Sequence, residues 1–405
     1  GQVQVVCPAQ NLGQGAPLAL AMIVAEEMGA DIAKVTLIAA PRDSATYGNP
    51  LFLGRMVTAD SKTTRGYYEP LRLAGAEARL ALVETASRKM GWVAAKCRAE
   101  NHHVLNTVSG AKISFSEIAT IGRLRMPGNI TARDLKPTSD FSLLGTSPDK
   151  DDQNDIVTGR KRFGVDYREE GTSIAVLLRS PHLGGLVISV DDSAAKAIEG
   201  VEDVVVLEDG VGVVASNTWS ALKGRAALSV EWSAPDDFSS ETERAKMTAA
   251  LEDAEQPRVS LRNAGSVTKA PDMTAEFYTP CLKHIILEPL NATAKGKNLG
   301  LGVEISGSTQ SPDLDMRFAA QTWKTAPFMI DVTGRPSGGA YGRRVLNDAV
   351  IDAAAVAKPL DRPVQVIRPM LDELQRGQVR PASFQRLAAS LSPDGNLLSW
   401  QHDIS

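Results

Sequence analysis

The feature that most limits how this chain can fold is a long interruption in its apolar pattern. Residues 122–156 are rich in Pro, Gly, Asp and Ser, a composition that breaks helices and strands and is typical of a linker. The chain has 405 residues, more than one simple hydrophobic core usually organises. We therefore expect a first segment over residues 1–121, with further domains after the linker.

Two further regions follow the linker. Residues 157–234 contain short β-branched runs separated by Gly and Asp, with helical stretches between them, which predicts a small α+β module. Residues 235–258 are charged and helix-prone, which is typical of an exposed connector. Residues 259–405 alternate strand-like and helix-like stretches and close with a predicted hairpin over residues 384–404. We expect the last strand of that hairpin to need another neighbour.

Composition and charge exclude several classes of function. The chain is 43% hydrophobic and 23% charged, which is typical of a globular, water-soluble protein. Its formal net charge of -4 argues against a general nucleic-acid binder, which would carry a basic surface. The most apolar run, residues 18–25, ends at Glu26-Glu27 and is far too short to cross a bilayer. We expect neither nucleic-acid binding nor a transmembrane segment.

The three cysteines, Cys7, Cys97 and Cys281, lie far apart and form no Cys-x-x-Cys pair. They suggest neither a zinc site nor an iron–sulfur site, and the Cys-x-x-Cys-His motif of haem attachment is missing from the sequence. Buried free thiols are the simpler interpretation, and we predict no metal-ligand set. The chain opens at Gly1, without a methionine, on a strand-like stretch, so we expect a leading segment to precede it.

The first forty residues predict a strand, a turn, a helix and a second strand. The strands are expected over residues 3–6 and 35–39, and the helix over residues 17–28, which Gly29 ends. Gln14 lies in a glycine-flanked turn just before this helix. Backbone N–H groups and the helix dipole favour anions at such a place, so Gln14 is a candidate ligand-binding residue.

A run of hydroxyl side chains precedes the next predicted helix, over residues 67–90. Ser61, Thr63 and Thr64 flank Lys62, and together they could donate several hydrogen bonds to phosphate or pterin groups. Ser and Thr also cap helices, and the helix that follows needs a cap. Both interpretations stay open.

A glycine-rich loop over residues 336–344 reads Pro-Ser-Gly-Gly-Ala-Tyr-Gly-Arg-Arg. Glycines lack Cβ and let a backbone come close to a ligand, while Arg343 and Arg344 offer planar forks of donors for anionic oxygens. The loop is either a cradle for a large anionic cofactor or a surface turn with two solvated arginines.

The order of short motifs along nearly the whole chain resembles the molybdopterin-binding large subunit of the xanthine dehydrogenase/aldehyde oxidase family. The branch that it resembles is that of isoquinoline 1-oxidoreductase and membrane-associated aldehyde dehydrogenases. The motifs are Gly13-Gln14-Gly15, Tyr47-Gly48-Asn49-Pro50, Arg65-Gly66, Glu69-Pro70-Leu71-Arg72, Val157-Thr158-Gly159, Phe163-Gly164-Val165-Asp166, Ser180-Pro181, Trp219, Glu288-Pro289-Leu290-Asn291, Thr309-Gln310 and Gly338-Gly339-Ala340-Tyr341-Gly342-Arg343-Arg344.

The resemblance implies an α+β fold in which molybdopterin-binding segments, over residues 1–121 and 259–405, flank an α/β hammerhead domain over residues 157–234. It implies that the amide of Gln310 lies beside the molybdenum oxo group and that the glycine loop presents N–H groups to the metal's oxygen ligands. The cofactor implied is molybdopterin cytosine dinucleotide. The residues that would bind it are Gln14, Ser61, Thr63, Thr64, Gln310, Gly339, Ala340, Tyr341, Gly342 and Arg343.

The chain departs from the family pattern in three ways. Ala340 stands where the family loop usually has glycine, and adds a Cβ where close approach is wanted. Asp60 replaces a glycine in the segment Thr58-Ala59-Asp60-Ser61, and its negative charge near phosphates needs a cation such as Lys62. The family's catalytic base, a glutamate near the C-terminus of the full subunit, lies beyond the point matched by Ser405, so we identify no catalytic residue and expect no turnover by the chain alone.

Three hypotheses remain. The chain supplies half of the molybdopterin site of a split large subunit that oxidises aldehydes or hydroxylates N-heteroaromatic compounds, or it is a degenerate, non-catalytic paralogue that serves assembly, or it is an unrelated soluble binding protein. For the first two, the resemblance implies a second large-subunit chain, an iron–sulfur subunit with its [2Fe–2S] clusters and a c-type cytochrome with haem. It also implies the periplasmic side of the bacterial inner membrane.

Overall fold

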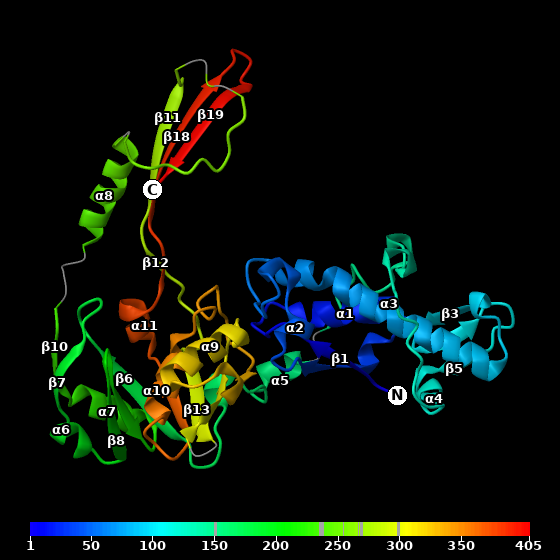
Figure 1. Cartoon of the computed structure of the whole chain (residues 1–405), viewed down its shortest axis with the longest axis horizontal. Coiled ribbons are helices and arrows are strands. Elements are labelled where there is room, and N and C mark those ends of the chain that lie inside the picture. The colour runs from blue at the N-terminus through cyan, green and yellow to red at the C-terminus, as the bar shows by residue number, and fades with distance from the viewer. Residues whose placement is uncertain (150–151, 235–238, 254, 266, 268–269, 298–299) are drawn as a thin grey trace.

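The computed structural model describes three parts, which Figure 1 shows from one side. An N-terminal unit, residues 1–149, lies beside a central body, and a small sheet, which we call the distal sheet, stands away from both. Among the described helices, none is long and apolar enough to cross a membrane. The described residues are 1–149, 152–234, 239–253, 255–265, 267, 270–297 and 300–405.

The N-terminal unit begins with the predicted strand, helix and strand. β1 (Val3–Cys7) pairs in parallel with β2 (Val35–Ala39), and α1 (Ala16–Met28) connects them, as expected for a right-handed crossover. α3 (Thr63–Met90) packs along α1. The remaining elements are the short helices α2 (Ser44–Tyr47) and α4 (Phe115–Ala119) and a sheet of β3 (Cys97–Glu100), β4 (His103–Asn106) and β5 (Lys112–Ser114).

Two buried glutamates of α1 tie this unit together. Glu27 forms ion pairs with Arg72, at 2.6 Å, and Arg79, at 2.9 Å, on α3. Glu26 accepts backbone N–H groups from residues 142–144 and pairs with Lys136 at 3.2 Å. Because residues 136–144 are held against α1 in this way, this part of the predicted linker belongs to the N-terminal unit.

The central body is built on one seven-stranded sheet, with the order β15-β14-β13-β16-β6-β9-β8. Strands of the predicted middle module and of the predicted third region pair directly, β16 lying parallel to β6. The two regions therefore share one sheet. Its strands are β6 (Ser173–Arg179), β8 (Val201–Leu207), β9 (Gly210–Ala215), β13 (Asn291–Lys297), β14 (Gly302–Gly307), β15 (Ile330–Gly334) and β16 (Val364–Ile367).

Helices cover both faces of this sheet, which explains why its strands β6 and β9 are almost entirely apolar and buried. α7 (Thr218–Ala226) packs against Val176 and Ala215 on one face. α9 (Pro312–Trp323) and α10 (Asp348–Ala357) share a core with Ala175 on the other face. Smaller elements are α5 (Gln153–Val157), α6 (Ser193–Lys196), α11 (Met370–Arg376) and the ribbon of β7 (Val187–Asp191) and β10 (Ser229–Trp232).

The distal sheet contains the predicted C-terminal hairpin. The hairpin strands are β18 (Ser383–Leu391) and β19 (Leu397–Ile404), and β18 finds its second neighbour in β11 (Met273–Thr279). The helix of the predicted connector, α8 (Ser240–Glu252), packs beside β18, while Pro235 and the rest of residues 235–238 lie outside the described part. A two-stranded stalk, β12 (Leu282–Lys283) with β17 (Val379–Arg380), leads back to the body.

We expect Glu26→Gln to lower the free energy of unfolding by about 2 to 3 kcal/mol at pH 7, because several bonds to a buried carboxylate are lost. Burial alone would raise the pKa of Glu26, but the N–H groups of residues 142–144 and Lys136 lower it below 4.5. The stabilisation is therefore present above pH 4.5 and is lost as the pH falls through the lowered pKa.

Urea denaturation at pH 7 and pH 3 measures this difference. Glu69→Gln, at an exposed position of α3, is the matched control and should change little. A loss of stability of the same size at both pH values would contradict the assignment.

Candidate functional site

The predicted site segments meet at one edge of the central sheet. β14 and β15 are parallel neighbours, so their carboxyl ends lie at the same edge. Gln310 follows β14, and the glycine loop follows β15. The backbone N–H of Gln310 donates to the carbonyl of Arg344 at 3.0 Å, and its side-chain Oε1 accepts the N–H of Arg344 at 3.2 Å.

Gln310 also joins the body to the N-terminal unit. Its Nε2 donates to the carbonyl of Thr58 at 2.8 Å, and its own carbonyl accepts the N–H of Thr58 at 2.9 Å. The hydroxyl of Thr58 accepts the N–H of Gln10 at 3.0 Å. Gln310 is only 3% exposed, so the amide predicted to face the cofactor is engaged by protein backbone on both sides.

Glu288 holds the glycine loop in place. Its buried carboxylate accepts the N–H of Gly338 at 2.8 Å, that of Val165 at 3.0 Å, and pairs with Arg344 at 3.0 Å. A Cβ on Gly338 would lie 2.7 Å from the Cβ of Glu288, so only glycine permits this approach. Glu288 was not among the predicted site residues, although the motif Glu288-Pro289-Leu290-Asn291 contains it.

Both arginines of the loop point inward. Arg344 is fully buried and donates to the carboxylate and carbonyl of Glu288 and to the carbonyl of Gly339. The Arg343 guanidinium donates to Glu373, to Asp348 at 2.7 Å and to the carbonyl of Leu346 at 3.1 Å. The prediction that the Arg343 side chain reaches a cofactor is therefore corrected, because carboxylates of the same chain take its donors.

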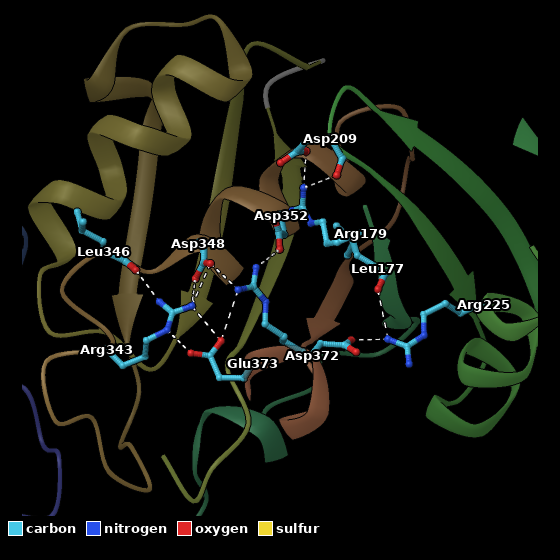
Figure 2. A network of polar contacts seen from close by, with 11 residues as sticks. Leu177, Arg179, Asp209, Arg225, Arg343, Leu346, Asp348, Asp352, Asp372 and Glu373 are labelled. Carbon is cyan, nitrogen blue, oxygen red and sulfur yellow. Dashed lines mark hydrogen bonds and ion pairs between the residues drawn. The ribbon is translucent and has the colours of Figure 1, made fainter. Parts of the chain in front are cut away.

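Arg343, which is buried, is one end of a network of alternating charges that runs from the glycine loop to the exposed Asp209, as Figure 2 shows. Arg368 connects Asp348 to Asp352, and Arg179 connects Asp352 to Asp209. Burial disfavours the charged form of Arg368, but Asp348, Asp352 and Glu373 raise its pKa above the usual value. Three arginines of the network pair with four carboxylates of the same chain, so its guanidinium groups need no external anion.

A cavity of about 570 Å³ lies between the start of α1 and the glycine loop. Gln14, Gly339, Ala340 and Tyr341 line it, so the structure brings together two of the predicted segments. Gln14 shapes its turn, because its Oε1 accepts the N–H of Leu12 at 2.9 Å. The lining residues are 11–15, 17, 18, 37, 152, 156, 161, 163, 287 and 336–341.

The cavity wall offers backbone donors. Gly339, Tyr341 and Gly342 have positive φ values of 96°, 52° and 93°, a backbone in which successive N–H groups can form an anion-binding concavity. Within the described part of the chain, the N–H groups of residues 339–342 donate to no protein acceptor. The first turn of α1 adds N–H groups without a side-chain cap. This donor set suits a large anionic ligand.

The hydroxyl cluster lies elsewhere. Thr63 and Thr64 form the first turn of α3, and Ser61 precedes it, but none of the three lines the cavity. The expected helix cap is not formed either, because no side chain caps α3 at Lys62. Lys62 does pair with Asp60 at 2.9 Å, so the negative charge of Asp60 has the compensating cation that we expected. The role of the cluster in cofactor binding stays a prediction.

Comparison with known proteins gives the site its context. Two family models, both described as a molybdopterin cofactor-binding domain, match residues 1–159 and 254–405. The isoquinoline 1-oxidoreductase subunit beta of Brevundimonas diminuta is 29% identical over this whole chain and 58% of its own length. The membrane-bound aldehyde dehydrogenase of Gluconacetobacter polyoxogenes is also 29% identical, over the whole chain and 53% of its length. The chain thus spans little more than half of these relatives.

Solved structures agree on the fold. Quinoline 2-oxidoreductase from Pseudomonas putida 86 superposes with a TM-score of 0.51 at 19% identity, over 64% of this chain and 38% of that one. The aldehyde oxidoreductase of Desulfovibrio gigas gives the same TM-score at 17% identity, over 63% and 33% of the two chains. The two cofactor-domain matches therefore show that this chain belongs to the molybdopterin cofactor-binding family, and the relatives it resembles include isoquinoline 1-oxidoreductase subunit beta and a membrane-bound aldehyde dehydrogenase.

Proposed function

We propose that this chain forms part of the molybdopterin site of a molybdenum hydroxylase, an oxidoreductase that acts on aldehydes or N-heteroaromatic compounds within a complex. The donor-lined cavity between α1 and the glycine loop carries the proposal. The chain supplies one part of a split large subunit, and a second polypeptide supplies the rest of the cofactor domain and the general base. The relatives' names support the two substrate classes.

The cavity fits the proposed cofactor in size and in chemistry. Its volume of about 570 Å³ falls in the range of small-molecule and cofactor sites. An anionic, phosphate-bearing cofactor without protein thiolates needs many N–H donors, and residues 339–341 and the start of α1 present them. When bound, the molybdenum cofactor would supply the oxidation chemistry. The chain's own residues would hold its anionic groups and orient it.

A second candidate function is structural. The Gln310 amide already bonds Thr58 and Arg344, and the Cβ of Ala340 lies on the cavity wall. Both observations favour a paralogue that retains the cofactor fold and serves assembly of the complex. The two candidates differ in whether Gln310 affects catalysis.

The complex we propose includes subunits that carry the electrons onward. The three cysteines of this chain are free thiols, so the [2Fe–2S] clusters and haem c would belong to an iron–sulfur subunit and a c-type cytochrome. We also propose that the cofactor is the cytosine dinucleotide form. The complex would lie on the periplasmic side of the bacterial inner membrane.

We expect Leu287→Glu to lower the molybdenum and pterin content of the purified complex at least tenfold. Leu287 lines the cavity and is 82% exposed, so a carboxylate there repels an anionic cofactor with little effect on folding. Metal analysis and pterin fluorescence measure the content. Leu183→Glu, 66% exposed and outside this cavity, is the matched control. Equal cofactor content in both variants would refute the proposed site.

We expect Gln310→Ala in the assembled complex to lower kcat at least tenfold at unchanged molybdenum content. The control is Gln365→Ala, because Gln365 is also buried and its Nε2 also donates to backbone carbonyls. Both variants should lose about 1 to 3 kcal/mol of stability, since each leaves buried groups unpaired. Unchanged activity of Gln310→Ala would favour the structural candidate.

A further inference from the structure

The distal sheet has one apolar face and one polar face. Residues directly opposite one another on antiparallel strands share a face. Met273 of β11 lies opposite Ala389 of β18, which lies opposite Trp400 of β19. The same register aligns Phe277 with Gln385 and Ile404, so these residues lie on the face of Trp400. We call this the apolar face; its large members are Met273, Phe277, Leu387, Trp400 and Ile404.

The helix beside this sheet lies on the other face. Glu276, Arg386 and Asp403 are opposite one another there, and Arg386 pairs with Glu276 at 2.8 Å. α8 reaches this polar face twice, through Glu252, 3.9 Å from Arg386, and through Arg244, 4.8 Å from the ring centroid of Tyr278. The nearest helix therefore leaves the apolar face uncovered.

Large side chains of the apolar face are exposed to solvent. Met273 is 55% exposed, Phe277 56%, Trp400 54% and Ile404 55%. A contiguous apolar patch of this kind marks an interaction surface in soluble proteins, and a three-stranded sheet needs a packed apolar face for its stability. Among the described strands, β11 and β19 have no partner on their outer edges.

The composition of this face indicates a protein partner. Aromatic side chains and methionine are enriched in the cores of protein interfaces and charged side chains are depleted, as here. The stalk also connects the sheet to the candidate site, because Arg380 of β17 donates to the carbonyl of Tyr341 in the glycine loop at 3.3 Å. The distal sheet and the glycine loop of the candidate site are therefore linked through the stalk.

We propose that the apolar face of the distal sheet is the docking surface for the portion of the large subunit that the relatives possess and this chain does not match. The chain spans 58% and 53% of two relatives, so a large part of their subunits lies outside the matched region. The inference rests on the proposed function, in which the chain is one part of such a subunit. The proposal assigns the contact between the two parts to the apolar face of the distal sheet.

Hydroxyl-radical footprinting of the native complex, isolated through a tag on this chain, tests the assignment. We expect the oxidation rate of Trp400 to fall at least fivefold in the complex relative to the isolated chain. Trp219, which is 65% exposed on α7, should keep its rate and serves as the matched control. Cross-links from β19 should reach the polypeptide that carries the relatives' unmatched segment.

The double variant Phe277→Ser with Trp400→Ser should weaken association with that polypeptide at least tenfold, whereas Trp219→Ser should not. An unprotected Trp400 in the complex, or cross-links from β19 only to another subunit, would overturn the proposal. Protection that grows with the concentration of the isolated chain, together with a dimer in sedimentation, would assign the face to a second copy and overturn it as well.

The footprint and the cofactor content give separate answers. Molybdenum in a complex whose Trp400 stays exposed would refute the docking surface and leave the proposed function standing. Protection of Trp400 in a complex without molybdenum would refute the cofactor site and leave the docking surface standing.

Discussion

The ion pair between Glu288 and Arg344 organises the edge of the central sheet. Both side chains are buried, and a lone buried charge would be costly, so each requires the other. The same Oε2 of Glu288 that pairs with Arg344 also accepts the N–H of Gly338, and its Oε1 accepts the N–H of Val165, from a distant part of the sequence. One carboxylate thus fixes the start of the glycine loop relative to the rest of the body. The position of every cavity donor on that loop follows from this contact.

The two loop arginines serve the protein interior, and this determines what the cavity can bind. The guanidinium group of Arg343 donates to Asp348 and Glu373, and that of Arg344 donates to Glu288. The loop therefore offers mainly backbone N–H groups to the cavity. Backbone donors are fixed in direction and carry no net charge. Recognition of an anion here therefore depends on loop geometry, which positive φ angles at residues 339, 341 and 342 define.

Local patterns predicted the local elements well. The alternation around residues 3–6 and 35–39 and the glycine after residue 28 predicted β1, α1 and β2, because each signal depends on neighbours in sequence. The shared seven-stranded sheet escaped prediction because it depends on a pairing between Val364 and Ser173, which no local pattern encodes. The same limit explains why β11 was not recognised as the neighbour of the terminal hairpin.

At the site, sequence reasoning identified the segments more reliably than the direction of their side chains. Gln310, the Gln14 turn and the glycine loop could be named as candidates because their motifs are contiguous, and the structure places the Gln14 turn and the loop on one cavity. Arg343 was assigned to the cofactor because an exposed arginine fork suits anions, and only the folded chain shows Glu373 beside it. Its direction depends on a carboxylate that is distant in sequence, so it could not be inferred from the loop itself.

The distal sheet differs from the central body, because large apolar side chains on one of its faces are exposed to solvent. The central body pairs the arginines of its charge network with its own carboxylates, whereas the sheet places its charged residues under α8 and leaves Phe277 and Trp400 in solvent. Strand alternation alone could not reveal this, since which face α8 covers depends on its contacts with Arg386 of β18 and Tyr278 of β11. Apolar surface is costly to expose and non-directional in what it binds. Binding a broad protein surface would therefore bury the most apolar area on the face of Trp400. The polar face, which α8 already covers, would bury little apolar area against the same partner.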